Sequence, residues 1–387
     1  MFNNLIIIFL GQEYNSCNHK FLYNEFANNK LFSNVLIVEI PADIVYSPIF
    51  KYKRIIEHFT GCRKLSTNIY IYRPLIFIRE LISTHYINKI NGCLLKHSLS
   101  KFQIIKNADN IFCLFYGPQM YEIAKESVNK PYMLYYVVDE HKYIARNCKI
   151  NKLLYKYEKE IMPHCNIIFT ASDKLTERRR KYNKNVFTIG NGTSLKNINR
   201  NIENISKYKW SKYNSIGMFG HIRNWIDFGL LEQLVNKMSD SKFIFAGPIQ
   251  EKIKNYFLDF ISKNKNCIYI GVIAKEKMSE IYQSVSIGIV PYKKNKFIEA
   301  SKPIKIAEFI LNGIPVVTVP CYGYKEYSFL KFAKTVDEFK KSIESLFGIT
   351  INPRSREFLH FITYNAWENI SKKMIKKIKD IDGVKIL

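Results

Sequence analysis

The stretch Ser286–Pro320 reads SIGIVPYKKNKFIEASKPIKIAEFILNGIPVVTVP and decides the fold of the second half of the chain. Its pattern is a short apolar strand, a polar basic loop, a helix, a turn and a β-branched strand of the kind buried in parallel sheets. The spacing predicts a helix over Lys302–Asn312, with Ser301 as its N-cap. Gly313 and the proline two residues later end it. The stretch therefore predicts one repeat of an α/β sheet.

Two charged residues on this helix, Lys305 and Glu308, are three positions apart and share a face. A cation in the first turn, beside free backbone N–H groups and the positive end of the helix dipole, suits a phosphate. A carboxylate one turn further along suits a pair of sugar hydroxyls. The pattern thus outlines a nucleotide-sugar site. The alternative is a surface salt bridge worth roughly a few tenths of a kcal/mol.

The composition is that of a globular chain. Its 387 residues suffice for two domains with separate cores, and 47% of them are apolar. The apolar run Leu5–Leu10 is far shorter than the roughly 20 residues of a membrane span and lacks the flanks of a signal peptide. We interpret it as a first β-strand and expect a cytoplasmic protein. The eight cysteines form no metal-binding spacing and are expected to be free thiols.

The chain is strongly basic, with 59 Lys and Arg against 33 Asp and Glu and a formal net charge of +26. The electrostatic field of such a charge favours the binding of polyanions, namely nucleotide phosphates, nucleic acid or an anionic membrane face. The parallel abundance of Lys, Asn, Ile and Tyr is also typical of biased base composition, so the charge is supporting evidence only. We expect docking on the inner face of an anionic membrane, assisted by aromatics such as Trp367 or those of the N-terminal helices.

The first half alternates short apolar runs with amphipathic segments, as βαβ units do. A basic helix is predicted over Asp173–Tyr182 with Ser172 as N-cap, and its Arg178–Arg180 run is interpreted as a solvated face. The predicted strands are Leu5–Leu10, Val35–Ile40, Asn68–Tyr72, Ile111–Phe115, Met133–Val138, Ile167–Thr170 and Val186–Ile189.

Three ionisable residues, Asp139, Glu140 and His141, follow the predicted strand Met133–Val138. Ligands of open α/β sheets bind at the carboxyl ends of strands, so these side chains are candidate catalytic groups. The alternative is a helix start that Asp139 caps. The residues themselves leave both interpretations open.

A polar stretch without apolar periodicity, around 204–209, separates the first βα series from a second one. The second series begins with the strand Ser215–Phe219. We predict an N-terminal domain over 1–205, a C-terminal domain over 206–352 and a helical tail over 353–387 that crosses back.

Several motifs, in order, resemble those of GT-B glycosyltransferases, in particular family-4-like (group 1) members that build bacterial polysaccharides and teichuronic acids. The C-terminal signature resembles P-x-K-x-x-E-[YF] followed by G-x-P-V-V. The matching segments are Asn191-Gly192, Phe219–Asp227, Phe245–Pro248, Ile270-Gly271, Ser301–Phe309 and Gly313–Val317, with Tyr136–His141 and Thr170–Ser172 as weaker matches.

This resemblance implies two Rossmann-like domains facing a cleft, with the donor bound in the second domain. It implies donor contacts from Gly220, His221, Arg223, Gly247, Lys302, Pro303, Lys305 and Glu308. Glu308 would accept hydrogen bonds from the nucleoside ribose, and the cations would neutralise the diphosphate. The implied reaction retains the anomeric configuration and needs neither a metal nor an organic cofactor.

The chain departs from the family pattern at two points. In the first domain Tyr136-Val137-Val138-Asp139 replaces the more usual Tyr-Asp start, so the resemblance carries over only Asp139 and Glu140. Many retaining members carry a second glutamate near the reacting sugar, but Ala300 stands eight residues before Glu308. Glu299, one position away, and Ser301 are the possible sugar contacts.

The resemblance implies a hexosyltransferase acting on a glycan or lipid-linked acceptor in surface polysaccharide biosynthesis. The basic charge also allows a DNA-glucosylating enzyme, although no nucleic-acid-reading motif supports one and nucleic acid is not an expected partner. A catalytically degenerate GT-B binding subunit is the non-enzymatic alternative.

Overall fold

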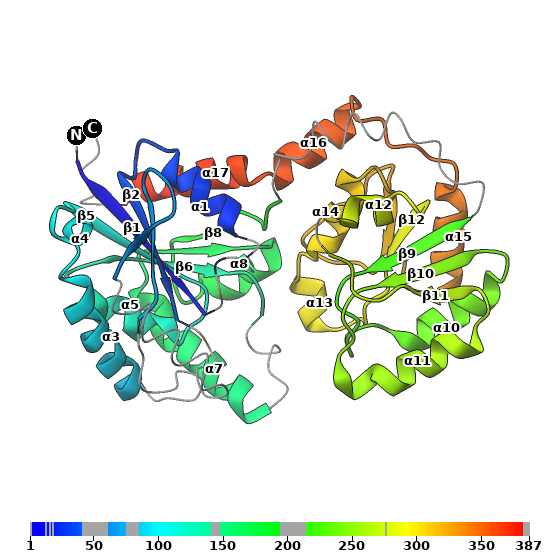
Figure 1. Cartoon of the computed structure of the whole chain (residues 1–387), viewed down its shortest axis with the longest axis horizontal. Helices are drawn as coiled ribbons and strands as arrows, with labels where there is room; N and C mark the ends of the chain where they lie inside the picture. Colours follow the sequence, from blue (N-terminus) through cyan, green and yellow to red (C-terminus); the bar gives the residue numbers. More distant parts are fainter. Residues whose placement is uncertain are drawn as a thin grey trace. The chain divides into compact units, whose positions relative to one another are not determined.

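The computed structural model describes residues 2–11, 14, 17, 19–40, 61–74, 85–140, 148–193, 214–274 and 277–381. The chain forms two compact units, coloured along the sequence in Figure 1. The first unit combines Met1–Gly192 with Trp367–Leu387, and the second is Thr193–Ala366. The predicted boundary at 205/206 falls outside the described residues. The predicted α/β class is confirmed, because each unit is built on its own parallel sheet.

The first unit has an eight-stranded sheet of order β3-β4-β2-β1-β5-β6-β7-β8. Every described strand pair in it is parallel except β3 with β4. The predicted strands all form, with ends within one residue of the prediction, and within the described ranges of this unit the two-residue edge strand β3 is the one strand that was not predicted. The strands are β1 (Asn4–Leu10), β2 (Asn34–Glu39), β3 (Arg63–Lys64), β4 (Ile69–Tyr72), β5 (Asn110–Phe115), β6 (Tyr132–Val137), β7 (Ile167–Thr170) and β8 (Val186–Thr188).

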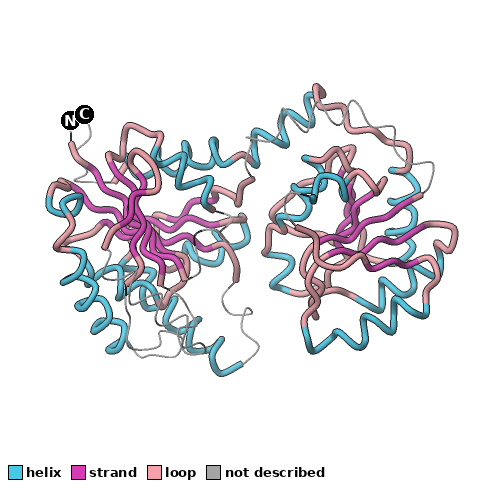
Figure 2. The backbone as a smooth tube through the Cα atoms, in the orientation of Figure 1, coloured by secondary structure: helices cyan, strands magenta, loops and turns pink. Residues whose placement is uncertain are grey.

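Helices flank this sheet (Figure 2). They include the predicted basic helix α8, which Ser172 caps by accepting a hydrogen bond from the Leu175 N–H. The helices of the first unit are α1 (Lys20–Ala27), α3 (His85–Leu99), α4 (Gln103–Lys106), α5 (Met120–Ser127), α7 (Cys148–Ile161), α8 (Asp173–Arg180) and α17 (Trp367–Lys379).

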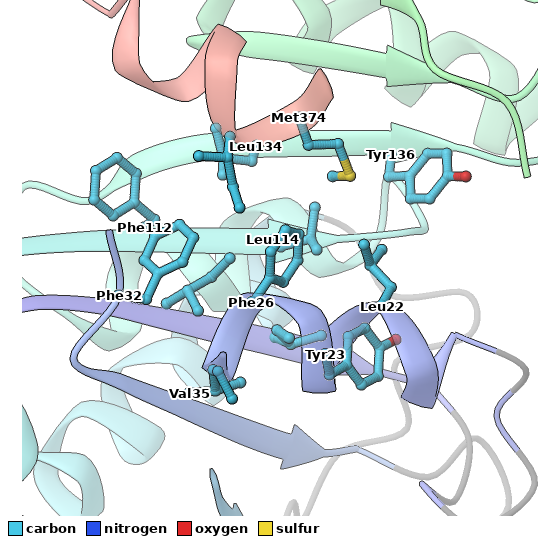
Figure 3. Close-up of a cluster of buried hydrophobic side chains, with 14 of the residues drawn as sticks. Leu22, Tyr23, Phe26, Phe32, Val35, Phe112, Leu114, Leu134, Tyr136 and Met374 are labelled. Carbon is cyan, nitrogen blue, oxygen red and sulfur yellow. The ribbon is translucent and has the colours of Figure 1, made fainter. Parts of the chain in front are cut away.

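The last helix, α17, completes the core of the first unit. Figure 3 shows Met374 of α17 beside Leu134 and Tyr136 of β6, in the same apolar cluster as the side chains of α1. Trp367 at the start of α17 is only 1% exposed. The expectation that Trp367 helps the protein dock on a membrane is therefore wrong: its indole fills the core.

The second unit has a six-stranded, all-parallel sheet of order β11-β10-β9-β12-β13-β14. Numbered from its own first strand, this is the 3-2-1-4-5-6 order of a Rossmann sheet, whose topological switch point lies between β9 and β12. The strands are β9 (Ser215–Phe219), β10 (Lys242–Ala246), β11 (Cys267–Tyr269), β12 (Ile287–Val290), β13 (Val316–Thr318) and β14 (Leu330–Phe332).

The helices of the second unit follow the predicted series. They are α10 (Phe228–Lys237), α11 (Lys254–Lys263), α12 (Met278–Tyr282), α13 (Lys296–Ala300), α14 (Ile304–Leu311), α15 (Val336–Leu346) and α16 (Arg356–Asn365). The predicted C-terminal tail therefore divides, since α16 belongs to the second unit and α17 to the first.

The predicted helix start at Ser301 is wrong. The helix α14 begins at Ile304, with Pro303 as its N-cap. Ser301 instead ends a short helix, α13, that forms within the predicted loop, where Asn295 caps it by accepting hydrogen bonds from two backbone N–H groups. The Ser301 hydroxyl donates to the Ile298 carbonyl at 2.8 Å. The predicted stop is confirmed, because Gly313 takes a positive φ of 79°.

The side chains of seven of the eight cysteines are described, and all seven are free thiols. Among the described residues, no helix has both the length and the apolar character needed to cross a membrane.

Candidate functional site

Two backbone turns touch at the carboxyl ends of β9 and β10. Gly220 and Gly247 follow these strands with φ of 118° and 131°, a region that L side chains rarely adopt. A Cβ on Gly247 would lie 2.1 Å from the carbonyl oxygen of Gly220. The Gly220 N–H donates to the Ala246 carbonyl at 2.8 Å. Both positions therefore require glycine, and neither turn carries a side chain of its own at the carboxyl ends of β9 and β10.

Lys305 lies directly over this backbone. A Cβ on Gly220 would lie 2.6 Å from Cε of Lys305. The Lys305 ammonium pairs with Oε2 of Glu308 at 2.6 Å, and the two side chains are 28% and 32% exposed. The structure therefore brings together Gly220, Lys305 and Glu308, three of the residues predicted to bind the donor.

Tyr282, at the end of α12, completes the surroundings of Glu308. Its hydroxyl donates to Oε2 of Glu308 at 3.1 Å. Its ring packs edge-on against Phe219 and Phe309. Burial, together with the charge of Glu308, raises the pKa of Tyr282 well above its usual value, so the phenol keeps its proton and donates. Tyr282 could not be predicted from the sequence, because a lone tyrosine 26 positions before Glu308 carries no spacing signal.

The start of α14 faces the same site. No described side chain caps this helix, because its N-cap is Pro303. The Tyr324 hydroxyl donates to the Pro303 carbonyl at 3.1 Å and so fixes the residue that precedes the first turn. The first-turn N–H groups and the positive end of the helix dipole are thus held beside Lys305 and can receive an anion.

Further positive charge comes from the loop after β9. The Arg223 guanidinium lies 4.9 Å from the ring centroid of Trp225, and its Nη2 lies 3.4 Å from Nδ1 of His221. Partial desolvation and the charges of Arg223 and Lys305 lower the pKa of His221, so this histidine is largely neutral at pH 7. The charges of Arg223 and Lys305 thus act on one common region, where an anion would be stabilised. Trp225 was not among the predicted site residues.

Lys302, also predicted to bind the donor, lies in different surroundings. It is 5% exposed, and its ammonium lies 5.4 Å and 5.2 Å from the ring centroids of Tyr324 and Tyr364. These cation–π contacts anchor the segment before α14. Of the two possible sugar contacts, Ser301 is buried and Glu299 is half-buried on α13. The roles of these three residues in donor binding stay predictions.

In the first unit, Glu140 has two arginine partners. Its carboxylate pairs with Arg178 at 2.7 Å and with Arg179 at 3.2 Å, and Arg179 also pairs with Glu158 at 2.8 Å. Burial alone would raise the pKa of Glu140, but the two arginines outweigh it and hold the pKa below the usual range. The prediction of a solvated arginine face is wrong for Arg179, which is 2% exposed, because two buried carboxylates neutralise it.

Asp139 precedes this ion-pair network. Burial raises its pKa to about 6. A carboxyl group with that pKa can both accept and release a proton near neutral pH. His141, the third predicted catalytic residue, lies outside the described residues.

Two α/β units, the second with Rossmann strand order and with glycine turns and a helix N-terminus at its switch point, define the GT-B fold. Two solved structures share it over nearly the whole chain. A glycosyltransferase from Rickettsia africae ESF-5 has a TM-score of 0.65, and the match covers 99% of this chain and 100% of that one. Anabaena HepE, in complex with UDP and glucose, has a TM-score of 0.59, with 98% and 100% covered. At 12% identity each, they show a common fold.

A curated relative was found by sequence. The chain is 26% identical over 176 residues to a Bacillus subtilis (strain 168) protein provisionally named teichuronic acid biosynthesis glycosyltransferase TuaH. The match covers 43% of this chain and spans 43% of the relative's length. No protein-family model matches the chain. The resemblance to GT-B proteins that the motifs predicted is confirmed at the level of the fold.

Proposed function

We propose that this protein is a glycosyltransferase that moves a sugar from a nucleoside diphosphate-sugar to a glycan or lipid-linked acceptor in surface polysaccharide biosynthesis. The observation that carries the proposal is the site in the second unit, where Lys305 covers the Gly220 backbone and Glu308 follows one turn later on α14. The relatives support it, since TuaH and the Rickettsia africae protein are named glycosyltransferases and HepE was crystallised with UDP and glucose.

In this reaction the bond between the sugar anomeric carbon and the diphosphate oxygen breaks, and its electron pair leaves with the nucleoside diphosphate. A bond forms between that carbon and an acceptor oxygen, whose proton is released. Negative charge grows on the diphosphate in the transition state. We propose that Lys305, Arg223 and the first-turn N–H groups of α14 stabilise this charge, and that transfer therefore needs no metal ion.

Glu308 has a different role in the proposal. Its carboxylate is only partly exposed and is oriented by the Tyr282 hydroxyl and the Lys305 ammonium. An oriented carboxylate accepts two hydrogen bonds from the vicinal hydroxyls of a ribose. We therefore propose that Glu308 binds the nucleoside end of the donor while Lys305 binds its phosphates.

We assign acceptor binding to the first unit. Asp139, whose pKa is about 6, is proposed to receive the acceptor proton or to orient the acceptor hydroxyl. Glu140 is proposed as a positioning residue, because its bonds to Arg178 and Arg179 fix the backbone beside Asp139. We further propose retention of the anomeric configuration, which NMR of the product anomeric proton would test. An inverted product would overturn that part alone.

The first experiment measures donor binding and transfer. Purified protein is screened for thermal stabilisation by a panel of nucleoside diphosphates and their sugars, and the donor selected is then assayed for turnover. We expect Lys305→Ala and Glu308→Ala each to lower turnover by about 100-fold or more, since each removes a charge-assisted contact to the donor. EDTA should leave the turnover of the wild-type protein unchanged.

The matched control is another lysine–glutamate pair with the same spacing. Lys174 and Glu177 on α8 lie 2.7 Å apart. Lys174→Ala and Glu177→Ala should leave turnover unchanged. Equal turnover in all four variants would refute the site assignment. Tight nucleotide binding without turnover on any acceptor extract would identify a degenerate binding subunit instead, and DNA-dependent turnover would identify a nucleic-acid acceptor.

A further inference from the structure

The helix α3 of the first unit has an apolar ridge on its outward side. Tyr86, Ile90 and Leu94 are 73%, 39% and 45% exposed. They are spaced i, i+4 and i+8, so they form one continuous line along the helix. Single exposed apolar side chains need no explanation, but three aligned on one helix indicate a surface that is covered in use.

The opposite side of α3 shows that this arrangement is fixed. A Cβ on Gly92 would lie 3.0 Å from the Glu122 carbonyl oxygen, so α3 and α5 pack backbone against backbone. Asn88 and Asn91 are buried on this side. The inward side also carries Leu95 and Leu99, which are buried, so the outward line of apolar side chains is additional to the apolar contact that α3 makes with the core. The helix cannot roll its ridge into the core, because the close contact at Gly92 would be lost.

Positive charge flanks the ridge. Lys89 and Lys96 are exposed on α3, as is the polar side chain of His97, and Lys101 lies two residues beyond the end of the helix. Within α3 itself the sequence HYINKINGCLLKHSL contains no acidic residue. An apolar ridge beside lysines, whose long side chains can reach past it, is the pattern of a helix that lies in the interface of an anionic bilayer.

We propose that this outward face of α3, defined by Tyr86, Ile90, Leu94, Lys89, Lys96 and His97, docks the protein on an anionic lipid bilayer. Figure 1 shows α3 at the periphery of the first unit. An anionic bilayer suits this face better than a second copy of the chain does. Two copies that met through this face would bring their lysines together, and like charges repel. Bilayer docking is a property separate from the proposed reaction, and vesicle binding can be measured without turnover.

The test is co-sedimentation of the full chain with vesicles of phosphatidylcholine alone or with a quarter of phosphatidylglycerol. We expect binding to the anionic vesicles. The triple variant Tyr86→Ser, Ile90→Ser, Leu94→Ser should bind at least about tenfold more weakly, because three apolar side chains no longer enter the interface. Lys89→Gln and Lys96→Gln should each weaken binding about fivefold.

Matched controls separate this face from the general basic charge. The variant Tyr256→Ser, Leu258→Ser, Ile268→Ser removes the same residue types, which are 48%, 41% and 44% exposed in the second unit, and should bind like the wild type. Lys372→Gln and Lys376→Gln, on the exposed side of α17, should also have little effect. An unchanged melting temperature and circular dichroism spectrum of the α3 triple variant would show that it is folded.

Three outcomes would overturn the proposal. The first is equal vesicle binding by the α3 triple variant and the wild type. The second is a loss of binding in the α17 lysine variants as large as in the α3 variants, which indicates non-specific charge. The third is a wild-type dimer in solution, without vesicles, that the α3 triple variant abolishes, which indicates a second copy as the occupant.

Discussion

Replacement of Gly220 by alanine tests the candidate donor site most directly. The new Cβ would lie 2.6 Å from Cε, 3.2 Å from Cδ and 3.5 Å from Nζ of Lys305. The lysine side chain must therefore move by roughly 1 Å to restore ordinary van der Waals contact. Its ammonium lies 2.6 Å from Glu308, so this movement disturbs both charged groups of the site.

The substitution should change two quantities, the free energy of unfolding and the free energy of nucleotide binding. Forcing an alanine to a φ of 118° lowers the free energy of unfolding by roughly 1–3 kcal/mol. Losing a charge-assisted hydrogen bond to a phosphate costs about 1.5–3 kcal/mol of binding free energy. The dissociation constant for the selected nucleoside diphosphate should therefore rise roughly 10- to 100-fold in Gly220→Ala. Isothermal titration calorimetry measures this directly.

Gly271 provides the matched control. It follows β11 with a φ of 82°, and a Cβ there would meet nothing within 4 Å. Gly271→Ala should therefore show a comparable loss of stability with unchanged nucleotide affinity. If the two alanine variants bind the nucleotide equally well, Lys305 does not contact it, and the reasoning about the site fails.

Three further predictions concern other buried groups. Tyr282→Phe should weaken nucleoside diphosphate binding severalfold in calorimetry, because Glu308 loses the hydrogen bond that orients it. Arg179→Met should lower the free energy of unfolding in urea by about 3–5 kcal/mol, because it leaves Glu158 buried without its cation and Glu140 paired with Arg178 alone. Burial lowers the pKa of His19 to about 4 from 6.5, so the unfolded state binds the proton more tightly. Stability should therefore fall by roughly 3 kcal/mol as pH drops from about 6.5 to 4, a dependence that His19→Phe should remove in urea titrations.

A specific result would contradict each of these three predictions. Unchanged affinity in Tyr282→Phe would mean that Glu308 is oriented by Lys305 alone. Arg179→Met should be compared with Lys174→Met on the same helix, which should change stability by less than about 0.5 kcal/mol, and equal effects would argue against the buried network. A pH dependence identical in the wild type and His19→Phe would assign the acid sensitivity to other groups.

The strands could be predicted from the sequence because burial on both faces of a parallel sheet demands runs of apolar residues. The run Leu5–Leu10 has the length of a buried strand and is too short for an ordinary buried helix. The edge strand β3, Arg63–Lys64, could not be predicted, because two charged residues carry no period. The start of α14 was misplaced for a related reason: Ser301 has the chemistry of an N-cap, but Asn295 caps an earlier, shorter helix, and Ser301 ends it.

The sequence alone determined the order of the βα units, the candidate pair Lys305 and Glu308, and the glycines that follow β9 and β10. These features are local, since spacing along one helix or the end of one strand decides them. Only the tertiary structure decided that Gly220 lies beneath Lys305 and that Tyr282 donates to Glu308. It also decided that Trp367 is buried and that α3 faces outward with Tyr86, Ile90 and Leu94. Such relations join residues far apart in the chain or depend on which face of a helix is covered, and no local pattern carries that information.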